Sequence, residues 1–524
     1  MADSNHDRIP PLGNKSQSIS AMRLLPYPAP ATSHLLPSSA APGPCRARPA
    51  QPAQQLQPSL AKPTLSTPSL LPLTEAVSLN VNDVSALKNA ASAALTNLMS
   101  FYTPNPSGVF DQAQTPWHES GMIWGLFMDY AKYTGDTQFL DVVTGALVNT
   151  SYGSEQDLLG GAMSSTAATL LGRWNDDILW HSLVPIGGAE IYGANSIMPG
   201  SKGPWITLAQ KTYDQTYQQW DDGCGGGIYW SRDRNGASAP YKSLITQLEF
   251  IQQGARNFMA NKNNTALDLS KAAMDWVFSS GLGNVQTGVL YDGMNVGECG
   301  KFTSHIWSYN YGALLGALAW MHKATGNNTY LDLVAPFYNY AQLTFSGQKV
   351  SNVVTETCEP GAKCNRDQQG FKAIYLRNLA YTYREATSDQ VKGAIKSTID
   401  ASVAAMVQYS CDDDWFCNGN WTADATPVKY VRSQHVAAAL LVSALGVHLS
   451  PEGGLLPKIT PGQLTDTTNG AAGLGSGGTK NPGKVTSKPL AAASGLKVTF
   501  SSIFLGLFTV AFSTSIFDPL AFIP

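Results

Sequence analysis

The chain has 524 residues, a formal net charge of -3 and only 14% charged residues. This length exceeds what one small core needs, but it suits one large helical toroid with flexible ends. The near-neutral balance provides no basic surface, which excludes nucleic acid as an expected partner.

The N-terminal region, residues 1–78, is rich in Pro, Ala and Ser and has no hydrophobic periodicity. Such composition predicts disorder. A secretory signal would begin with a charged stretch and an unbroken apolar stretch. The sequence after Met22 is instead broken by Pro26, Pro28 and Pro30. Either secretion is unconventional or this region is a faulty gene model, and we favour the second interpretation because the rest of the chain has the features of a secreted protein.

Residues 79–450 show apolar residues at spacings of three and four, which is typical of amphipathic helices. Gly, Asn, Asp and Pro separate the segments. A dozen similar helices without a sharp repeat favour paired hairpins in a closed toroid over an open solenoid. Gly227–Trp230 is the one short candidate strand. The predicted helices span 85–102, 118–133, 137–149, 175–192, 204–219, 242–260, 265–280, 303–324, 330–344, 368–386, 392–409 and 429–448.

Seven cysteines occur, of which Cys45 lies in the Pro/Ala-rich region and six lie in the helical region. An even number there, without a zinc-like spacing, favours disulfides and an oxidising compartment. We pair Cys358 with Cys364 and Cys411 with Cys417, and prefer Cys224 with Cys299, although spacing leaves this last connectivity open. Glycosylation sequons agree with that compartment and begin at Asn149, Asn263, Asn327 and Asn420.

The C-terminal region divides into two parts. Residues 451–496 are rich in Gly, Ser, Thr and Pro and are predicted to be a linker. Residues 497–524 form an apolar tail whose main run, 498–512, is shorter than the roughly 20 residues that span a bilayer. Small residues, a polar spacer and an apolar end are typical of a GPI-attachment signal. The alternative is a plain C-terminal anchor helix.

Two adjacent acids, Asp176 and Asp177, lie between large apolar residues in a chain that has few charges. Burying a carboxylate is costly unless it is paired or hydrogen-bonded, and a second one nearby raises the cost. Such a pair separates into one group that ionises and one that keeps its proton, as glycoside hydrolysis requires. The alternative is an ordinary helix start, with Asn175 as the N-cap and both acids in the first turn.

Several blocks occur in a fixed order along the helical region: Trp117–Gly121, Asn175–Asp177, Cys224–Trp230, Trp307–Gly312 and Asp367–Lys372, followed by Arg377. Together they resemble glycoside hydrolase family 76, the endo-α-1,6-mannanases, and especially its fungal GPI-anchored members. The resemblance covers about 80–450 and departs at His118, His181 and Ser182.

The resemblance implies an all-α (α/α)6 toroid of about six helical hairpins and retaining cleavage of α-1,6-mannan. It assigns the nucleophile to Asp176 and the acid/base to Asp177. It also implies transfer of GPI-linked mannan to wall β-glucan, at the cell wall or the outer face of the plasma membrane. No metal or organic cofactor is implied, and we expect a monomer.

The predicted substrate-binding residues each have a structural alternative. The Trp residues more often belong to a core, Glu119 to a helix start, and Lys372 and Arg377 to a solvated face. Tyr309 and Asn310 are polar residues at an apolar helix start. The predicted set is Trp117, Glu119, Asn175, Trp230, Tyr309, Asn310, Lys372 and Arg377.

Two other function classes remain open from the sequence. A catalytically silent mannan-binding cell-wall protein would use the same toroid. A magnesium-dependent terpene cyclase would need a spaced DDxxD motif and a second acidic cluster. The acidic run Asp412–Asp414 lies between Cys411 and Cys417, which favours a disulfide loop.

Overall fold

The structure is a computed structural model that describes residues 78–152, 156–159, 174–234, 236, 238, 240–346, 351–421 and 425–449. The predictions made for residues 1–77, for the linker and for the apolar tail lie outside these ranges.

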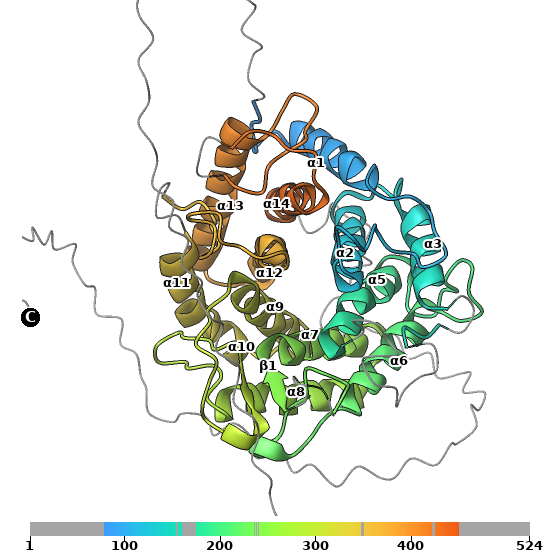
Figure 1. Cartoon of the computed structure of the whole chain (residues 1–524), viewed down its shortest axis with the longest axis vertical. Coiled ribbons are helices and arrows are strands. Elements are labelled where there is room, and N and C mark those ends of the chain that lie inside the picture. The colour runs from blue at the N-terminus through green and yellow to red at the C-terminus, as the bar shows by residue number, and fades with distance from the viewer. Residues whose placement is uncertain are drawn as a thin grey trace, which may run out of the picture. The chain divides into compact units, whose positions relative to one another are not determined.

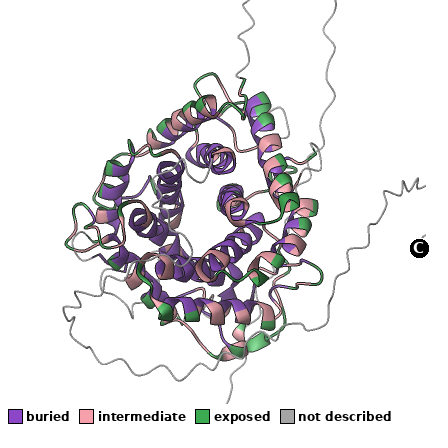
Figure 2. Cartoon of the chain, turned by 180° about the vertical axis from the view of Figure 1, so that it is seen from behind, coloured by how far each residue is buried: buried purple, intermediate pink, exposed green. Residues whose placement is uncertain are grey.

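Six helices form an inner ring. Each packs against the next, and the last packs against the first, so the ring closes. Nearly every residue of α14 is buried, because an inner helix contacts neighbours on all sides. Figure 2 shows this burial around the whole ring. The inner helices are α2 (Trp117–Thr134), α5 (Asn175–Tyr192), α7 (Leu244–Asn261), α9 (Ser308–Thr325), α12 (Phe371–Glu385) and α14 (Val431–His448).

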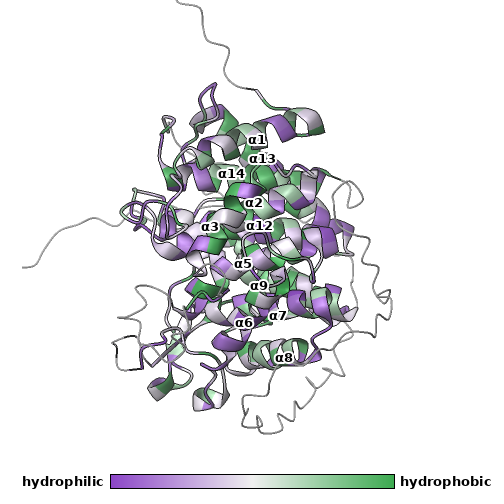
Figure 3. Cartoon of the chain, turned by 90° about the vertical axis from the view of Figure 1, so that its right-hand side faces the viewer, coloured by the Kyte–Doolittle hydropathy of each residue, from purple (hydrophilic) through white to green (hydrophobic). Residues whose placement is uncertain are grey.

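The outer helices surround this ring (Figure 1). Each packs on an inner helix with one apolar face and exposes the other, as the mixed colouring of α8 shows in Figure 3. This arrangement confirms the all-α (α/α)6 toroid. The outer helices are α1 (Val84–Met99), α3 (Leu140–Thr150), α6 (Trp205–Tyr217), α8 (Asn264–Ser279), α11 (Val334–Phe345), preceded by the short α10 (Thr329–Asp332), and α13 (Asp389–Ser410).

Most predicted helix bounds differ from the structure by one to three residues, and the start at 303 differs by five. Helix α9 begins at Ser308 and not at 303, the predicted helix 330–344 is divided into α10 and α11, and a 3-10 turn, η4 (Gln368–Gly370), precedes α12. The suggested strand at Gly227–Trp230 is wrong, because there Ile228 forms only an isolated bridge with Trp220. The short antiparallel strands are β1 (Tyr241–Ser243) and β2 (Gly293–Asn295), with Tyr241 opposite Asn295.

All three preferred disulfides are formed. Cys224–Cys299 joins the turns η2 (Gly223–Gly225) and η3 (Val296–Glu298) across 75 residues of sequence. Cys358–Cys364 and Cys411–Cys417 each close a short loop. None of the helices in the described ranges combines the length and apolar character that crossing a bilayer requires.

None of the four sequon asparagines is fully buried. Asn149 and Asn327 are exposed, while Asn263 and Asn420 are partly buried. Asn263 also caps α8, because its side-chain oxygen accepts a hydrogen bond from the backbone of Ala266 at 3.2 Å. Glycosylation of these residues stays a prediction.

Candidate active site

The two adjacent acids lie in the first turn of α5, at one end of the inner ring. The Trp230 indole donates a hydrogen bond to Asp176 Oδ2 at 2.8 Å. Asp176 Oδ1 accepts a second one from the backbone N–H of Asp177 at 3.1 Å. Asp177 Oδ2 accepts from the backbone N–H of Trp174 at 3.1 Å, and Asp177 Oδ1 lies 3.4 Å from His118 Nδ1. Both carboxyl groups are therefore fixed by named donors or neighbours.

The alternative of an ordinary helix start is right in placing both acids in the first turn but wrong in taking Asn175 as the N-cap, because α5 is capped at Trp174. The Asn175 side chain is occupied elsewhere. It donates to the Tyr229 carbonyl at 2.7 Å and accepts from Arg232 Nη1 at 2.8 Å. Asn175 thus ties the start of α5 to the segment that carries Trp230, while Asp177 reaches back to the cap.

The two acids differ in how their surroundings shift their pKa values. Burial raises the pKa of Asp176 to about 7, the Trp230 hydrogen bond opposes the rise, and the charge of Asp292 adds to it. Burial, and then the charge of Asp176, raises the pKa of Asp177 well above its usual range. Asp177 therefore keeps its proton at a pH where Asp176 has begun to lose its own.

His118, Glu119 and Asp367 place ligand atoms within 4.8 Å of one another. Glu119 is paired with Arg432 Nε at 2.8 Å. Burial raises the pKa of Glu119 to about 7 against the effect of Arg432, and burial lowers the pKa of His118 to about 4. We assign no cation to this group, because the Arg432 guanidinium already satisfies Glu119 and repels a positive ion.

Asp292 is a third carboxylate near the pair, and the sequence analysis missed it. It accepts hydrogen bonds from Tyr241 Oη at 2.9 Å, Asn310 Nδ2 at 2.9 Å and Tyr309 Oη at 3.2 Å. Asp292 is a single acid before Gly293 and belongs to no recognisable sequence motif. The polar Tyr309 and Asn310 at the start of α9 were the only signal, because they needed a partner.

One aromatic pair adjoins Asp176 and another adjoins Asp292. Trp174 and Trp230 meet edge to face with their ring centroids 4.1 Å apart, and both are half-buried. Tyr309, which donates to Asp292, stacks on Phe371 with a centroid distance of 4.1 Å. These rings combine an apolar face with partial exposure, as stacking surfaces require.

Trp117 lies deeper in the wall of the ring. Its side chain is only 5% exposed, it stacks on His181 at 3.8 Å, and its indole donates to Thr150 Oγ1 at 3.0 Å. This environment is that of a core residue. A direct contact of Trp117 with substrate stays a prediction.

Lys372 and Arg377 do not form a solvated face, because both are buried in α12. Lys372 Nζ donates to the Gly419 carbonyl and pairs with Glu359, both at 2.7 Å. Arg377 pairs with Asp129 at 2.8 Å and donates to a backbone carbonyl of α2. Their predicted role in substrate binding is not tested by these contacts.

The model of glycosyl hydrolase family 76 matches residues 86–452. Among curated proteins, the chain is 28% identical to the mannan endo-1,6-alpha-mannosidase DCW1 of Saccharomyces cerevisiae, over 66% of this chain and 77% of that protein. It is 27% identical to a putative mannan endo-1,6-alpha-mannosidase of Schizosaccharomyces pombe, over 74% and 87%.

Solved structures share the fold. Dfg5 from Chaetomium thermophilum in complex with glucosamine is 22% identical, with a TM-score of 0.61 over 72% of this chain and 92% of that one. An inactive variant of the alpha-1,6-mannanase GH76A from Salegentibacter sp. HEL1_6, in complex with alpha-1,6-mannotetrose, is 16% identical. Its TM-score is 0.56 over 69% of this chain and 99% of that one.

Proposed function

The chain belongs to glycosyl hydrolase family 76, and we propose that it is an endo-acting, retaining α-1,6-mannosidase of fungal cell-wall biogenesis. It acts as a hydrolase or a transglycosidase on wall mannan or on GPI-linked mannan. The observation that carries this proposal is the buried pair of adjacent aspartates with separated proton affinities. The names of the fungal relatives supply the linkage and the sugar.

Asp176 is the nucleophile of this proposal, since it ionises first and the Trp230 indole stabilises its anion. Asp177 donates its proton to the glycosidic oxygen as an Asp176 oxygen bonds to the anomeric carbon. The leaving sugar departs and a glycosyl ester remains. Asp177 then takes a proton from water or from an acceptor hydroxyl, whose oxygen displaces Asp176. Two displacements at one carbon retain its configuration.

The surrounding residues supply the sugar contacts. Asp292 is positioned to accept hydrogen bonds from sugar hydroxyls, because its carboxylate is held by three donors and is partly exposed. The half-buried Trp174–Trp230 pair and Tyr309 supply apolar faces for mannose rings. Two separate aromatic surfaces suit a substrate of several sugar rings, as endo-cleavage requires.

The localisation and the acceptor are part of the same proposal. We propose action at the cell wall or the outer face of the plasma membrane, with wall β-glucan as one acceptor. The GPI-attachment signal in residues 497–524, which lies outside the described residues, stays a prediction, as does a monomeric state.

The test uses the full chain produced through a secretory host and linear α-1,6-mannooligosaccharides. Proton NMR follows the anomer that appears first, with Asp176→Asn, Asp177→Asn and the exposed control Asp268→Asn. We expect wild type to release the α-anomer first or to form longer oligomers. Both products should be lost in the first two variants and kept in the control. Mannan binding measured by calorimetry, without turnover or transfer by wild type, would contradict the proposal and favour the silent mannan-binding protein.

A further inference from the structure

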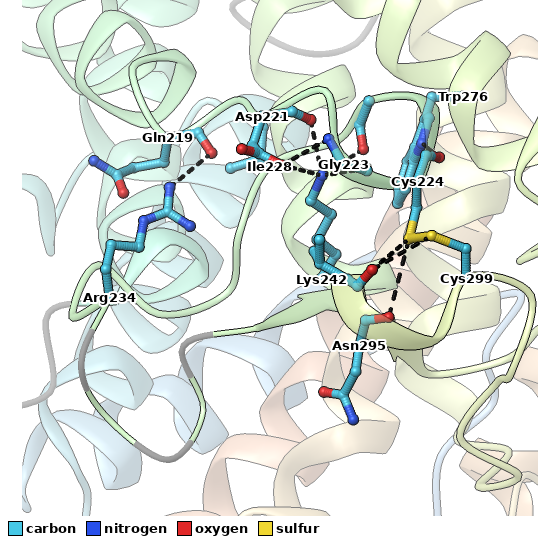
Figure 4. Close-up of polar contacts among 12 residues, drawn as sticks. Gln219, Asp221, Gly223, Cys224, Ile228, Arg234, Lys242, Trp276, Asn295 and Cys299 are labelled. Carbon is cyan, nitrogen blue, oxygen red and sulfur yellow. Dashed lines mark hydrogen bonds and ion pairs between the residues drawn. A yellow bond between two sulfur atoms is a disulfide. The ribbon is translucent and has the colours of Figure 1, made fainter. Parts of the chain in front are cut away.

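Lys242 has a fully buried side chain on β1, and its ammonium lies against a loop that precedes the Trp230 segment (Figure 4). Its Nζ donates to the carbonyls of Asp221 at 2.8 Å, Gly223 at 2.7 Å and Gly226 at 2.7 Å. Asp221 Oδ1 lies 3.3 Å from the same nitrogen. Three N–H donors thus meet three converging carbonyl oxygens, which matches the donor count of an ammonium group.

The loop that surrounds this ammonium is tightly packed. Gly226 and Gly227 have φ values of 133° and 96°, and a Cβ on Gly227 would lie 2.7 Å from the Trp276 ring. The Trp276 indole donates to the Cys224 carbonyl at 3.0 Å. The Cys224–Cys299 disulfide joins the same part of the loop to the end of η3 (Figure 4). The CGGG block therefore packs around a lysine and an indole, and its glycines are explained without a ligand.

The same loop leads directly into the residue that binds the nucleophile. Trp230 follows it by three residues, and its backbone N–H donates at 2.9 Å to the carbonyl of Tyr241, the residue before Lys242. Ile228 is held by Gln247, which accepts from its N–H at 2.9 Å and donates to its carbonyl at 2.7 Å. Lys242 and its neighbours thus fix both the loop and the backbone of Trp230.

We propose that Lys242 is a positioning residue, which holds the 221–226 loop so that the Trp230 indole reaches Asp176. Without the ammonium, the carbonyl oxygens of Asp221 and Gly226 would lose their donor, and that of Gly223 would keep only the Gly226 N–H at 3.4 Å. Buried polar groups without partners are destabilising. The loop would then rearrange and move Trp230. This inference rests on the proposed role of Asp176 as nucleophile, but it also predicts an effect that needs no turnover.

The first experiment compares pH profiles of kcat/KM on mannooligosaccharides for wild type, Lys242→Met and Trp230→Phe. Methionine keeps the packed stem and removes the donors. Loss of a hydrogen bond to the Asp176 anion raises the pH at which it ionises, so the acid limb moves upward by about one pH unit. The alkaline limb, which reports the ionisation of Asp177, is expected to stay within a few tenths of a pH unit of its wild-type position. Lys271→Met removes an exposed lysine on α8 and is the matched control.

The second experiment is independent of activity. The 19F NMR spectrum of 5-fluorotryptophan-labelled protein contains a Trp230 resonance, which Trp230→Phe identifies. This resonance is expected to titrate near pH 7 with Asp176 in wild type and in Lys271→Met, and to lose that titration in Lys242→Met. Titration in a wild type that turns nothing over would refute the proposed function and leave the positioning role standing.

An unchanged acid limb and an unchanged Trp230 titration in folded Lys242→Met would overturn the proposal. Should that variant fail to fold, Asp221→Asn keeps Lys242 and weakens one acceptor of the loop. It is expected to move the acid limb in the same direction by a smaller amount. No shift in Asp221→Asn, combined with unfolded Lys242→Met, would assign Lys242 to folding alone.

Discussion

Replacing Asp176 with Asn is predicted to stabilise the folded protein near pH 7 and to leave its stability unchanged near pH 4. Burial raises the pKa of Asp176 to about 7 in the folded protein, whereas an unfolded Asp titrates near about 3.9. Below pH 4 both states hold the proton. As pH rises from 4 to 7, only the unfolded chain releases it, so the carboxyl progressively disfavours folding.

The size of this effect follows from the same numbers. One proton retained over about three pH units corresponds to at most about 4 kcal/mol, and coupling to Asp177 reduces it to roughly 2–4 kcal/mol. A helical domain of about 370 residues has an unfolding entropy of roughly 0.8 kcal/mol/K, so the melting temperature at pH 7 rises by about 3–5 °C. Asparagine keeps an oxygen that the Trp230 indole can donate to.

The assay is calorimetric melting of both proteins from pH 4 to pH 8 at one scan rate. Only the difference between the variant and wild type is interpreted, because many groups titrate over this range. Asp268→Asn, on the exposed face of α8, is the matched control and should follow wild type throughout. A difference that is constant with pH, or that shrinks toward pH 7, would refute the reasoning.

Three further substitutions test the packing around the site. Gly227→Ala would place a Cβ 2.7 Å from an indole ring, and we expect it to lower both the melting temperature and kcat. Gly297→Ala has open space around its Cβ and should change neither quantity. Serine at both Cys224 and Cys299 opens a loop of 75 residues and should lower stability by about 2–4 kcal/mol in melting experiments; an unchanged melting temperature would contradict this. Arg377→Met leaves a buried carboxylate unpaired and should lower stability by about 3–5 kcal/mol; a raised KM in a protein of wild-type stability would instead place Arg377 at the substrate.

Much of the fold was predictable because each helix has a local sequence signal, the spacing of its apolar residues. Apolar spacing located twelve segments, and the alternation of buried and half-exposed helices follows from inner and outer positions in the ring. The predicted helix boundaries were wrong where contacts with distant segments determine where the helix begins. Helix α9 begins only at Ser308, whose N–H and hydroxyl both donate to the buried Glu356, and no local pattern predicts a partner 48 residues away.

The site was predictable only in part. Asp176 and Asp177 stand out because adjacent acids in an apolar segment are costly, which is a local signal. Asp292 has no such signal, since its partners Tyr241 and Tyr309 come from distant segments. Lys372 was open between substrate and solvent by spacing alone, yet the structure buries it between Glu359 and a backbone carbonyl. Asp292 and Lys372 meet their partners only when the ring of helices is closed.

The buried ion pairs of α2 explain how ring closure reaches the active site. Glu119 pairs with Arg432 and Asp129 pairs with Arg377, which joins α2 to helices 313 and 248 residues away in sequence. Apolar faces can slide past one another at low cost, whereas a slipped ion pair leaves a buried charge without a partner. Because His118 is adjacent to Glu119 on the same helix, these pairs fix the distance between His118 and the proton-holding acid of α5. We infer that ion pairs buried in the wall of the ring set the geometry of the acid at its end.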